Sequence, residues 1–202
     1  MTSALKIDEK IRQGVIESLP EVKQIQNKEL RERIYDAWAM ALEENGYTKI
    51  EEMPPETDPG GPVAKSGTTV EHIRSVARLS VAIVKELKNT FEQFDVDMDE
   101  VIAGGICHDI GRPFEYNPRN QKRWSSDPRI TGEPSLRHSV YGAHIALCAG
   151  LPEKIAHIAA GHSKEGEHIK RSLVAEIVHY ADVLFWRILD KAGFLETPDR
   201  SA

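Results

Sequence analysis

The chain has 202 residues, with 26 basic and 32 acidic side chains and a net charge of -6. This length fits one large domain, or one domain with an additional segment, and the acidic balance gives no general attraction to nucleic acid or anionic membranes. Two cysteines, Cys107 and Cys148, are too few for a disulfide framework, no secretory signal is recognisable, and no apolar run reaches the roughly 20 residues that span a bilayer. We therefore expect a cytoplasmic protein that binds neither nucleic acid nor membrane.

Residues 1–55 are predicted to form an N-terminal helical arm. From Glu21 to Glu44 large apolar residues recur at every fourth position, as on the buried face of a helix: Leu30, Ile34, Trp38 and Leu42. The pair Asn45-Gly46 then supplies a helix stop. This face can pack on the rest of the chain or on a second copy in a homodimer, and the sequence favours neither. Residues 56–68 lie in a stretch rich in proline and glycine and are predicted to be a connector.

Residues 69–192 carry the predicted main domain, which begins with two helices. Thr68 and Glu71 form a capping box ahead of a helix expected over residues 69–88. A second helix is expected over residues 97–111. Residues that can bind a metal lie on both helices: His72 on the apolar face of the first, and His108 and Asp109 in the last turn of the second.

The segment 112–137 differs from its surroundings. Four prolines interrupt it, so we predict a long loop or lid: Pro113, Pro118, Pro128 and Pro134. Its basic residues outnumber its three acidic ones: Arg112, Arg119, Lys122, Arg123, Arg129 and Arg137. We therefore expect a locally positive segment in an acidic protein.

Three further helices are predicted toward the C-terminus. One begins near Ser135 and carries His138, and another begins at Leu151-Pro152 and leads to His162. The last runs over residues 169–192, with Asp182 on its apolar face, where an unpaired carboxylate is costly and a cation is expected nearby. Residues 193–202 are predicted to be a C-terminal tail. The pattern as a whole is all-α.

Four histidines and two aspartates on these predicted helices can converge on one site. In chain order they are His72, His108, Asp109, His138, His162 and Asp182. Imidazole and carboxylate together suit iron, manganese, zinc or nickel, whereas carboxylates alone suit calcium or magnesium. The sequence therefore predicts a buried site for a transition metal.

The order of these residues resembles that of the HD-domain metal-dependent phosphohydrolase superfamily. Residues 107–111 read CHDIG, similar to the HDIG-type variant of that superfamily, and Asp182 closes the segment IVHYAD. The likeness extends over about residues 69–189. It implies an all-α HD-domain helical bundle, to which the N-terminal arm and the lid loop would be added.

The two additional histidines make the set similar to the binuclear branch of the superfamily. The resemblance implies two divalent or mixed-valence metal ions, iron or manganese, bridged by Asp109 as the catalytic residue. One ion would be held by His72, His108, Asp109 and Asp182, and the other by Asp109, His138 and His162. Two cations about 3.5 to 4 Å apart can hold a bridging hydroxide and neutralise the attacking and leaving oxygens of a phosphoryl displacement. In the alternative interpretation, His138 and His162 are hydrogen-bonded structural residues.

Three cations near the predicted ligands can bind an anionic phosphorylated substrate. Arg112 follows the CHDIG stretch, Arg137 precedes His138, and Lys164 follows His162 by two residues. The alternative is that they are solvated surface charges. Arg74 should point away from the metal face, and His179, three residues before Asp182, can orient a ligand.

The resemblance implies a phosphohydrolase that cleaves a phosphoester or phosphoanhydride of a small nucleotide-like substrate through a metal-bridging hydroxide. The same ligand set also resembles that of mixed-valence diiron HD-domain oxygenases acting on polyols or hydroxyphosphonates. Oxygen-independent phosphate release would favour the first, and oxygen uptake tied to product the second. A non-catalytic nucleotide sensor is a third reading, which predicts tight binding without turnover.

Overall fold

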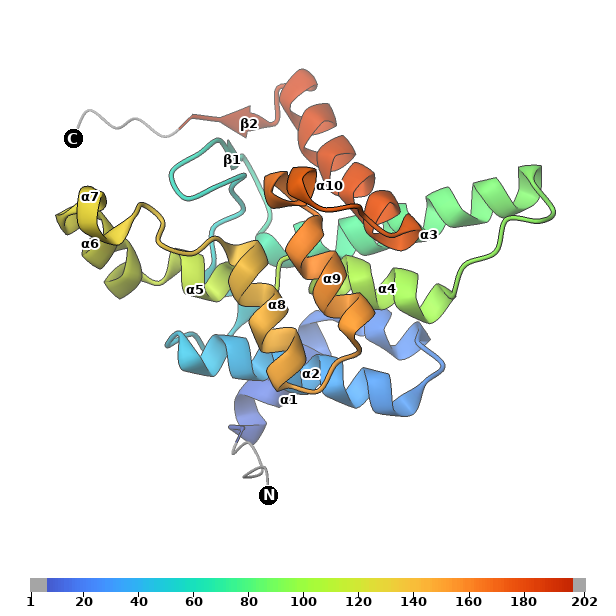
Figure 1. Ribbon diagram of the computed structural model, residues 1–202, viewed down its shortest axis with the longest axis horizontal. Helices are drawn as coiled ribbons and strands as arrows, with labels where there is room; N and C mark the ends of the chain where they lie inside the picture. Colours follow the sequence, from blue (N-terminus) through green and yellow to red (C-terminus); the bar gives the residue numbers. More distant parts are fainter. Residues whose placement is uncertain (1–6, 198–202) are drawn as a thin grey trace.

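The computed structural model describes residues 7–197 of the chain as a bundle of α-helices with one small β-ribbon (Figure 1). The helices are α1 Glu9–Ser18, α2 Lys28–Glu44, α3 Thr69–Thr90, α4 Met98–Cys107, α5 Arg112–Tyr116, α6 Pro118–Ser126, α7 Pro128–Thr131, α8 His138–Cys148, α9 Glu153–Gly161 and α10 Leu173–Lys191. Short 3-10 helices are η1 Pro20–Gln24, η2 Ile50–Glu52 and η3 Lys164–His168, and the antiparallel strands are β1 Val63–Ala64 and β2 Leu195–Glu196. The all-α prediction is confirmed. Among these residues, no helix is both long and apolar enough to cross a membrane.

The centre of the bundle is built from α3, α4, α8, α9 and α10. Helix α3 packs on α4, α8 packs on α9, and α10 contacts α3, α4 and α9. The predicted capping box begins α3, where the Thr68 side chain accepts from the N–H of Val70 and the Glu71 carboxylate accepts from the N–H of Thr68. A Cβ atom added to Gly105 on α4 would lie 2.5 Å from the Cα of Ala77 on α3. These two helices therefore approach more closely than side chains at that position would allow.

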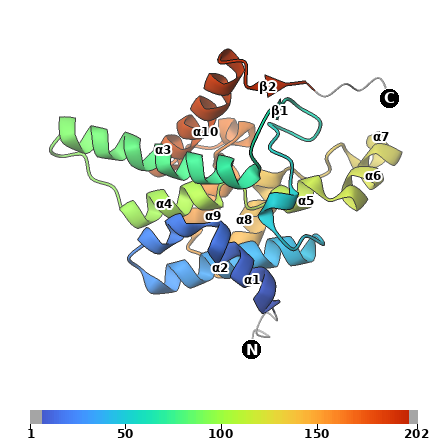
Figure 2. The ribbon, with the colours of Figure 1, turned by 180° about the vertical axis from the view of Figure 1, so that it is seen from behind.

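The N-terminal segment packs on this bundle rather than standing apart from it (Figure 2). Helix α2 contacts α4, α5 and α8. Trp38 on α2 is fully buried, and its indole Nε1 donates to the carbonyl oxygen of Ile106 on α4 at 3.2 Å. The apolar face of α2, for which the sequence left open packing on the same chain or on a second copy, is thus covered by the same chain.

One helix boundary in this segment differs from the prediction. Instead of one helix over residues 21–44, the chain forms η1 and then starts α2 afresh at Lys28. The cause is local: the Asn27 side chain accepts from the N–H of Leu30 at 3.1 Å and caps a new helix start.

The prediction of a long lid loop at residues 112–137 is wrong. The segment folds into α5, α6 and α7, and a proline stands in the first turn of each of them: Pro113, Pro118 and Pro128. Proline lacks an N–H that the first turn of a helix does not use, so these residues start helices instead of breaking them. Phe114 stacks on Tyr141 of α8 at 4.2 Å and packs on the buried ring of Trp124 at 5.6 Å between centroids. The segment is therefore held to the core by its aromatic rings.

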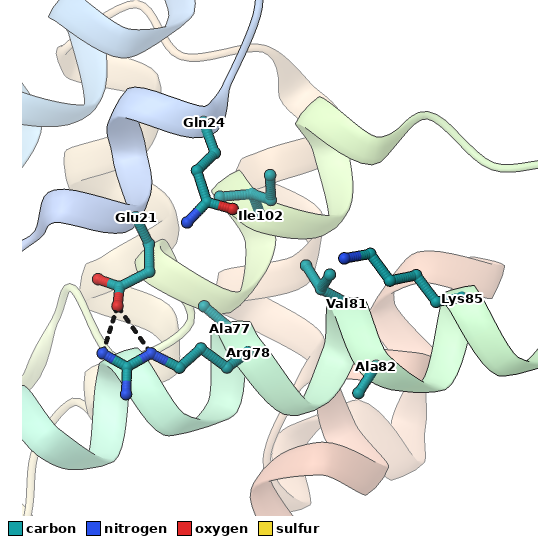
Figure 3. Close-up of a pocket in the computed structure, with 8 residues that line it drawn as sticks. All are labelled: Glu21, Gln24, Ala77, Arg78, Val81, Ala82, Lys85 and Ile102. Atoms are coloured by element: carbon teal, nitrogen blue, oxygen red, sulfur yellow. Dashed lines mark hydrogen bonds and ion pairs between the residues drawn. The ribbon is translucent and has the colours of Figure 1, made fainter.

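An ion-pair cluster joins the N-terminal segment to α3. Glu21 on η1 is largely buried, and its carboxylate accepts from Arg74 at 3.0 Å and from Arg78 at 2.5 Å. The cluster stands beside a cavity between η1, α3 and α4, which Gln24 and Ile102 also line (Figure 3). Arg74 thus points toward Glu21 and away from the predicted metal ligands, in the direction that the helix spacing predicts.

Replacing Glu21 with glutamine should lower the free energy of unfolding at pH 7 by about 1–2 kcal/mol, because two arginines lose their counter-ion. Burial acts to raise the pKa of Glu21, but the hydrogen bonds from Arg78 and Arg74 outweigh it and leave this pKa below 4.5. The carboxylate therefore stabilises the fold fully above pH 4.5, and this contribution is lost as the pH falls through the lower folded pKa. Urea unfolding at several pH values should show the gap between Glu21→Gln and the native protein closing in acid. The exposed Glu92→Gln control should show no such gap.

Candidate metal centre

The six predicted ligands come from five parts of the bundle and converge on one buried point. His72 lies in the first turn of α3, His108 and Asp109 follow α4 directly, His138 opens α8, His162 follows α9, and Asp182 lies in the middle of α10. All are buried except Asp182, whose side chain is 16% exposed. Helix ends supply four of them, because a side chain at a helix end can face a centre to which several helices point.

Asp109 occupies the middle of the cluster, and its two carboxylate oxygens face different histidines. Oδ2 lies 3.3 Å from Nε2 of His72 and 3.5 Å from Nε2 of His108. Oδ1 lies 3.4 Å from Nε2 of both His138 and His162. Asp182 adds an oxygen 3.4 Å from Nε2 of His72. The carboxylate therefore divides the cluster into two halves, one on each oxygen.

The hydrogen bonds of the imidazole rings fix which nitrogen faces the centre. Nδ1 of His108 donates to the carbonyl oxygen of Gly105 at 2.7 Å, and Nδ1 of His162 donates to that of Ala159 at 2.9 Å. Nδ1 of His138 donates to the Glu115 carboxylate at 2.6 Å. These partners only accept, so the neutral rings carry their proton on Nδ1 and direct the lone pair of Nε2 inward.

The distances between the inward-facing atoms show whether these residues fit a bound metal ion. Nε2 of His138 lies 3.3 Å from Nε2 of His162, and Nε2 of His108 lies 3.2 Å from Nε2 of His72. The Nε2 lone pairs of His138 and His162, whose rings carry their proton on Nδ1, repel each other at this distance unless a cation lies beside them. In addition, Oδ1 of Asp182 is buried and accepts no hydrogen bond from any residue that the structure describes. Both observations fit a bound cation, and the mixed nitrogen and oxygen donors suit a first-row transition metal.

Arg112 keeps the central carboxylate ionised. Its Nε donates to Oδ1 of Asp109 at 2.9 Å, and both side chains are buried. Burial alone would raise the pKa of Asp109, but the charge of Arg112 acts in the opposite direction, and this pKa is held well below its usual range. The ion pair with Arg112 therefore favours the ionised form of Asp109.

Glu115, which the sequence interpretation missed, contacts a predicted ligand and two arginines of the site. It is completely buried, and its carboxylate accepts from Nδ1 of His138 and from Arg112 at 3.4 Å and forms an ion pair with Arg137 at 2.8 Å. Burial acts to raise the pKa of Glu115, but His138 and the two arginines lower it overall. The sequence did offer one signal for Glu115: it is a carboxylate within a cation-rich segment and follows Arg112 by three residues.

The three predicted substrate cations differ in their surroundings. Arg112 is buried, and besides Asp109 and Glu115 it donates to the carbonyl oxygen of Thr57 at 3.0 Å. Arg137 forms ion pairs with Glu115, with Asp58 at 2.6 Å and with Glu165 at 3.1 Å. Lys164 is exposed and forms no ion pair with the residues that the structure describes. All three line a cavity of about 260 Å³ that His138, His162 and Asp182 also line.

Two further residues position the ligands. A Cβ atom on Gly111 would lie 1.9 Å from the carbonyl oxygen of His138, so only glycine lets the start of α8 approach the turn that carries Asp109. His179 donates from Nδ1 to the carbonyl oxygen of His162 at 2.5 Å, which agrees with its predicted orienting role.

Comparison with known proteins bears on this arrangement. Residues 69–186 match the HD domain family. The chain is 27% identical over 129 residues to a dihydroneopterin 2',3'-cyclic phosphate phosphodiesterase of Methanocaldococcus jannaschii, covering 62% of this chain and 49% of that protein. It is 28% identical over 135 residues to an uncharacterised protein of the same organism, covering 60% and 68% respectively.

A third similar protein is a tRNA (cytidine(56)-2'-O)-methyltransferase of Thermoplasma volcanium, 27% identical over 130 residues that cover 57% of this chain and 31% of that one. The chain thus spans about half the length of the phosphodiesterase and about a third of the methyltransferase. No solved structure matches it. Since the family match covers more than half of the chain and includes all six clustered side chains, the protein belongs to the HD domain family.

Proposed function

We propose that the protein is a metal-dependent phosphohydrolase that cleaves a phosphoester or phosphoanhydride of a small nucleotide-like molecule. The observation that carries this proposal is the central carboxylate of Asp109, each of whose oxygens faces two histidine Nε2 atoms. The similarity to a protein named as a cyclic phosphate phosphodiesterase supports the same reaction class.

In this proposal the protein holds two iron or manganese ions. His72, His108 and Asp182 would hold one, His138 and His162 the other, and Asp109 would bridge them. When bound, such ions polarise a phosphoryl group, lower the pKa of water and stabilise negative charge on the oxygens of the substrate.

The remaining residues of the centre keep the ligands in place. Arg112 maintains the charge of Asp109, and Glu115 holds the imidazole of His138 with its Nε2 lone pair inward. Such supporting contacts fix the ring orientation and make the ligand more basic. The chain thus holds these donors in position through hydrogen bonds with neighbouring side chains.

The organic part of the substrate has room beside the centre. A cavity of about 950 Å³ lies between residues 56–60 and α6, and it shares Asp58 and Arg137 with the smaller cavity at the metal ligands. Its volume lies within the range of roughly 300–1,000 Å³ that is usual for small-molecule sites. It is lined by polar side chains of α6, among them Gln121 and Lys122, which suit a nucleotide-like molecule.

The proposal is tested by removing and restoring the metal. Protein stripped with a chelator should release no phosphate from nucleotides, phosphomonoesters or 2',3'-cyclic phosphates, and those activities that depend on iron or manganese should return on reconstitution. The panel should include dihydroneopterin 2',3'-cyclic phosphate, the compound in the name of a relative.

The same assay, run with and without oxygen, separates the competing reactions. Oxygen-independent hydrolysis supports the phosphohydrolase. Oxygen uptake with a polyol or hydroxyphosphonate, without hydrolysis of any ester, would assign the centre to an oxygenase instead. Metal binding without turnover of either kind would indicate a sensor.

A further inference from the structure

The cations around the cavity at the metal ligands fall into two groups. Arg112 and Arg137 are held by carboxylates on several sides, as described above. Lys164 on η3 and Arg187 on α10 also line this cavity, and neither forms an ion pair with any residue between 7 and 197. Only the second group has a charge that the fold leaves uncompensated.

The acidic residues of the same cavity wall are already engaged. Asp58 pairs with Arg137 at 2.6 Å, and Glu167 pairs with Arg171 at 2.9 Å. Asp182 belongs to the cluster of metal ligands. No carboxylate of the wall is therefore available to neutralise Lys164 or Arg187, and an incoming anion would be their counter-ion.

Both cations lie on segments that adjoin the predicted metal ligands. Lys164 follows His162 by two residues, and its segment is tied back by Arg171, whose guanidinium donates to the carbonyl oxygens of Gly161 and Ser163. Arg187 follows Trp186, whose ring packs on the His72 ring at 4.8 Å between centroids. The two charges therefore come from two different segments, η3 and α10, that line the same cavity.

We propose that Lys164 and Arg187 together bind the phosphoryl group of the substrate, whereas Arg112 and Arg137 position the metal ligands through Asp109 and Glu115. This inference rests on the proposed phosphohydrolase function and adds to it: the substrate presents its anionic group to one lysine and one arginine. Arg187 can donate two parallel hydrogen bonds to phosphate oxygens, and Lys164 acts as a point charge. Arg187 was not among the cations that the sequence singled out.

The test measures binding of inorganic phosphate to the metal-reconstituted full chain by calorimetry. The variants Lys164→Gln and Arg187→Gln should each raise the dissociation constant about tenfold or more, because each removes a charge-assisted hydrogen bond. Arg187→Lys should recover part of this loss. Metal content should stay at the native value in all three.

Matched controls come from the same segments. Lys170→Gln and Lys191→Gln remove an equal charge from exposed positions next to η3 and on α10, outside this cavity, and should change phosphate affinity less than twofold. Arg137→Gln should instead lower metal content, because Glu115 loses a partner and holds His138 less firmly.

Three outcomes would overturn the inference: no phosphate binding by the native protein, equal losses in the test and control variants, or loss of metal from Arg187→Gln. Because the readout is binding, its result is independent of turnover. If no ester is hydrolysed but the variants lose phosphate as expected, the proposed reaction fails while the anion site stands. If esters are hydrolysed but the variants bind phosphate as the native protein does, the proposed reaction stands and the anion site fails.

Discussion

Replacing Asp109 with asparagine is expected to abolish the proposed phosphohydrolase activity, with a loss of roughly a thousandfold or more. The two oxygens of this carboxylate face both pairs of histidines, so the amide removes the negative charge and one ligand oxygen from the centre that both halves share. Metal-ion stabilisation of a phosphoryl transition state contributes several kcal/mol, and each 1.4 kcal/mol corresponds to about tenfold in rate. Steady-state assays and metal analysis of the purified variant provide the measurement.

This variant should also lose metal from both halves of the centre. A substitution on one side, His138→Ala, should spare the half that contains His72, His108 and Asp182. The exposed Asp190→Asn on α10 serves as the control and should keep native metal content and activity. If Asp109→Asn retained both metals and a tenth or more of the activity, the bridging role of Asp109 would have to be abandoned.

Replacing Glu115 with glutamine is expected to cost about 3–5 kcal/mol of stability, the effect of breaking a buried ion pair by removing one partner. The side chain is fully buried between Arg112, Arg137 and His138, so the amide would remove the carboxylate that these two arginines share and place an N–H donor against other donors. Metal affinity should fall roughly 10–100-fold as well, because the ring of His138 loses the acceptor that orients it. Denaturant unfolding and metal titration measure the two effects separately.

Two control variants show whether the loss of stability in Glu115→Gln comes from the buried ion pairs. Glu133→Gln removes the same charge from an exposed position in the same segment and should change stability by less than about 0.5 kcal/mol. Glu115→Asp keeps the charge but shortens the side chain, so it should be less destabilised than the glutamine variant. A glutamine variant as stable as the Glu133 control would mean that the Glu115 carboxylate does not hold the arginines together.

Features set within a few residues of the chain could be predicted from the sequence. The capping box at Thr68 and Glu71 begins α3 as predicted, since its hydrogen bonds join residues two or three apart. The predicted ligands do meet in one cluster, because each lies at a helix end or on an apolar helix face that must turn inward. Asp182 could be recognised from the sequence because it lies on an apolar helix face, where a carboxylate needs a cation nearby.

Features that depend on distant partners were decided only by the tertiary structure. Glu115 meets His138, 23 residues away, and Arg137 meets Asp58, 79 residues away. From the sequence, therefore, Arg112 and Arg137 were indistinguishable from Lys164 as substrate cations, because pairing depends on which carboxylates the fold brings near. The prolines of segment 112–137 signal helix starts as well as loops, and packing of Phe114 and Trp124 against the core favours the helices. The sequence by itself determined the helical class and named the candidate metal ligands, whereas the packing of the helices decided which cations pair with the carboxylates around these residues and which stay without an ion pair.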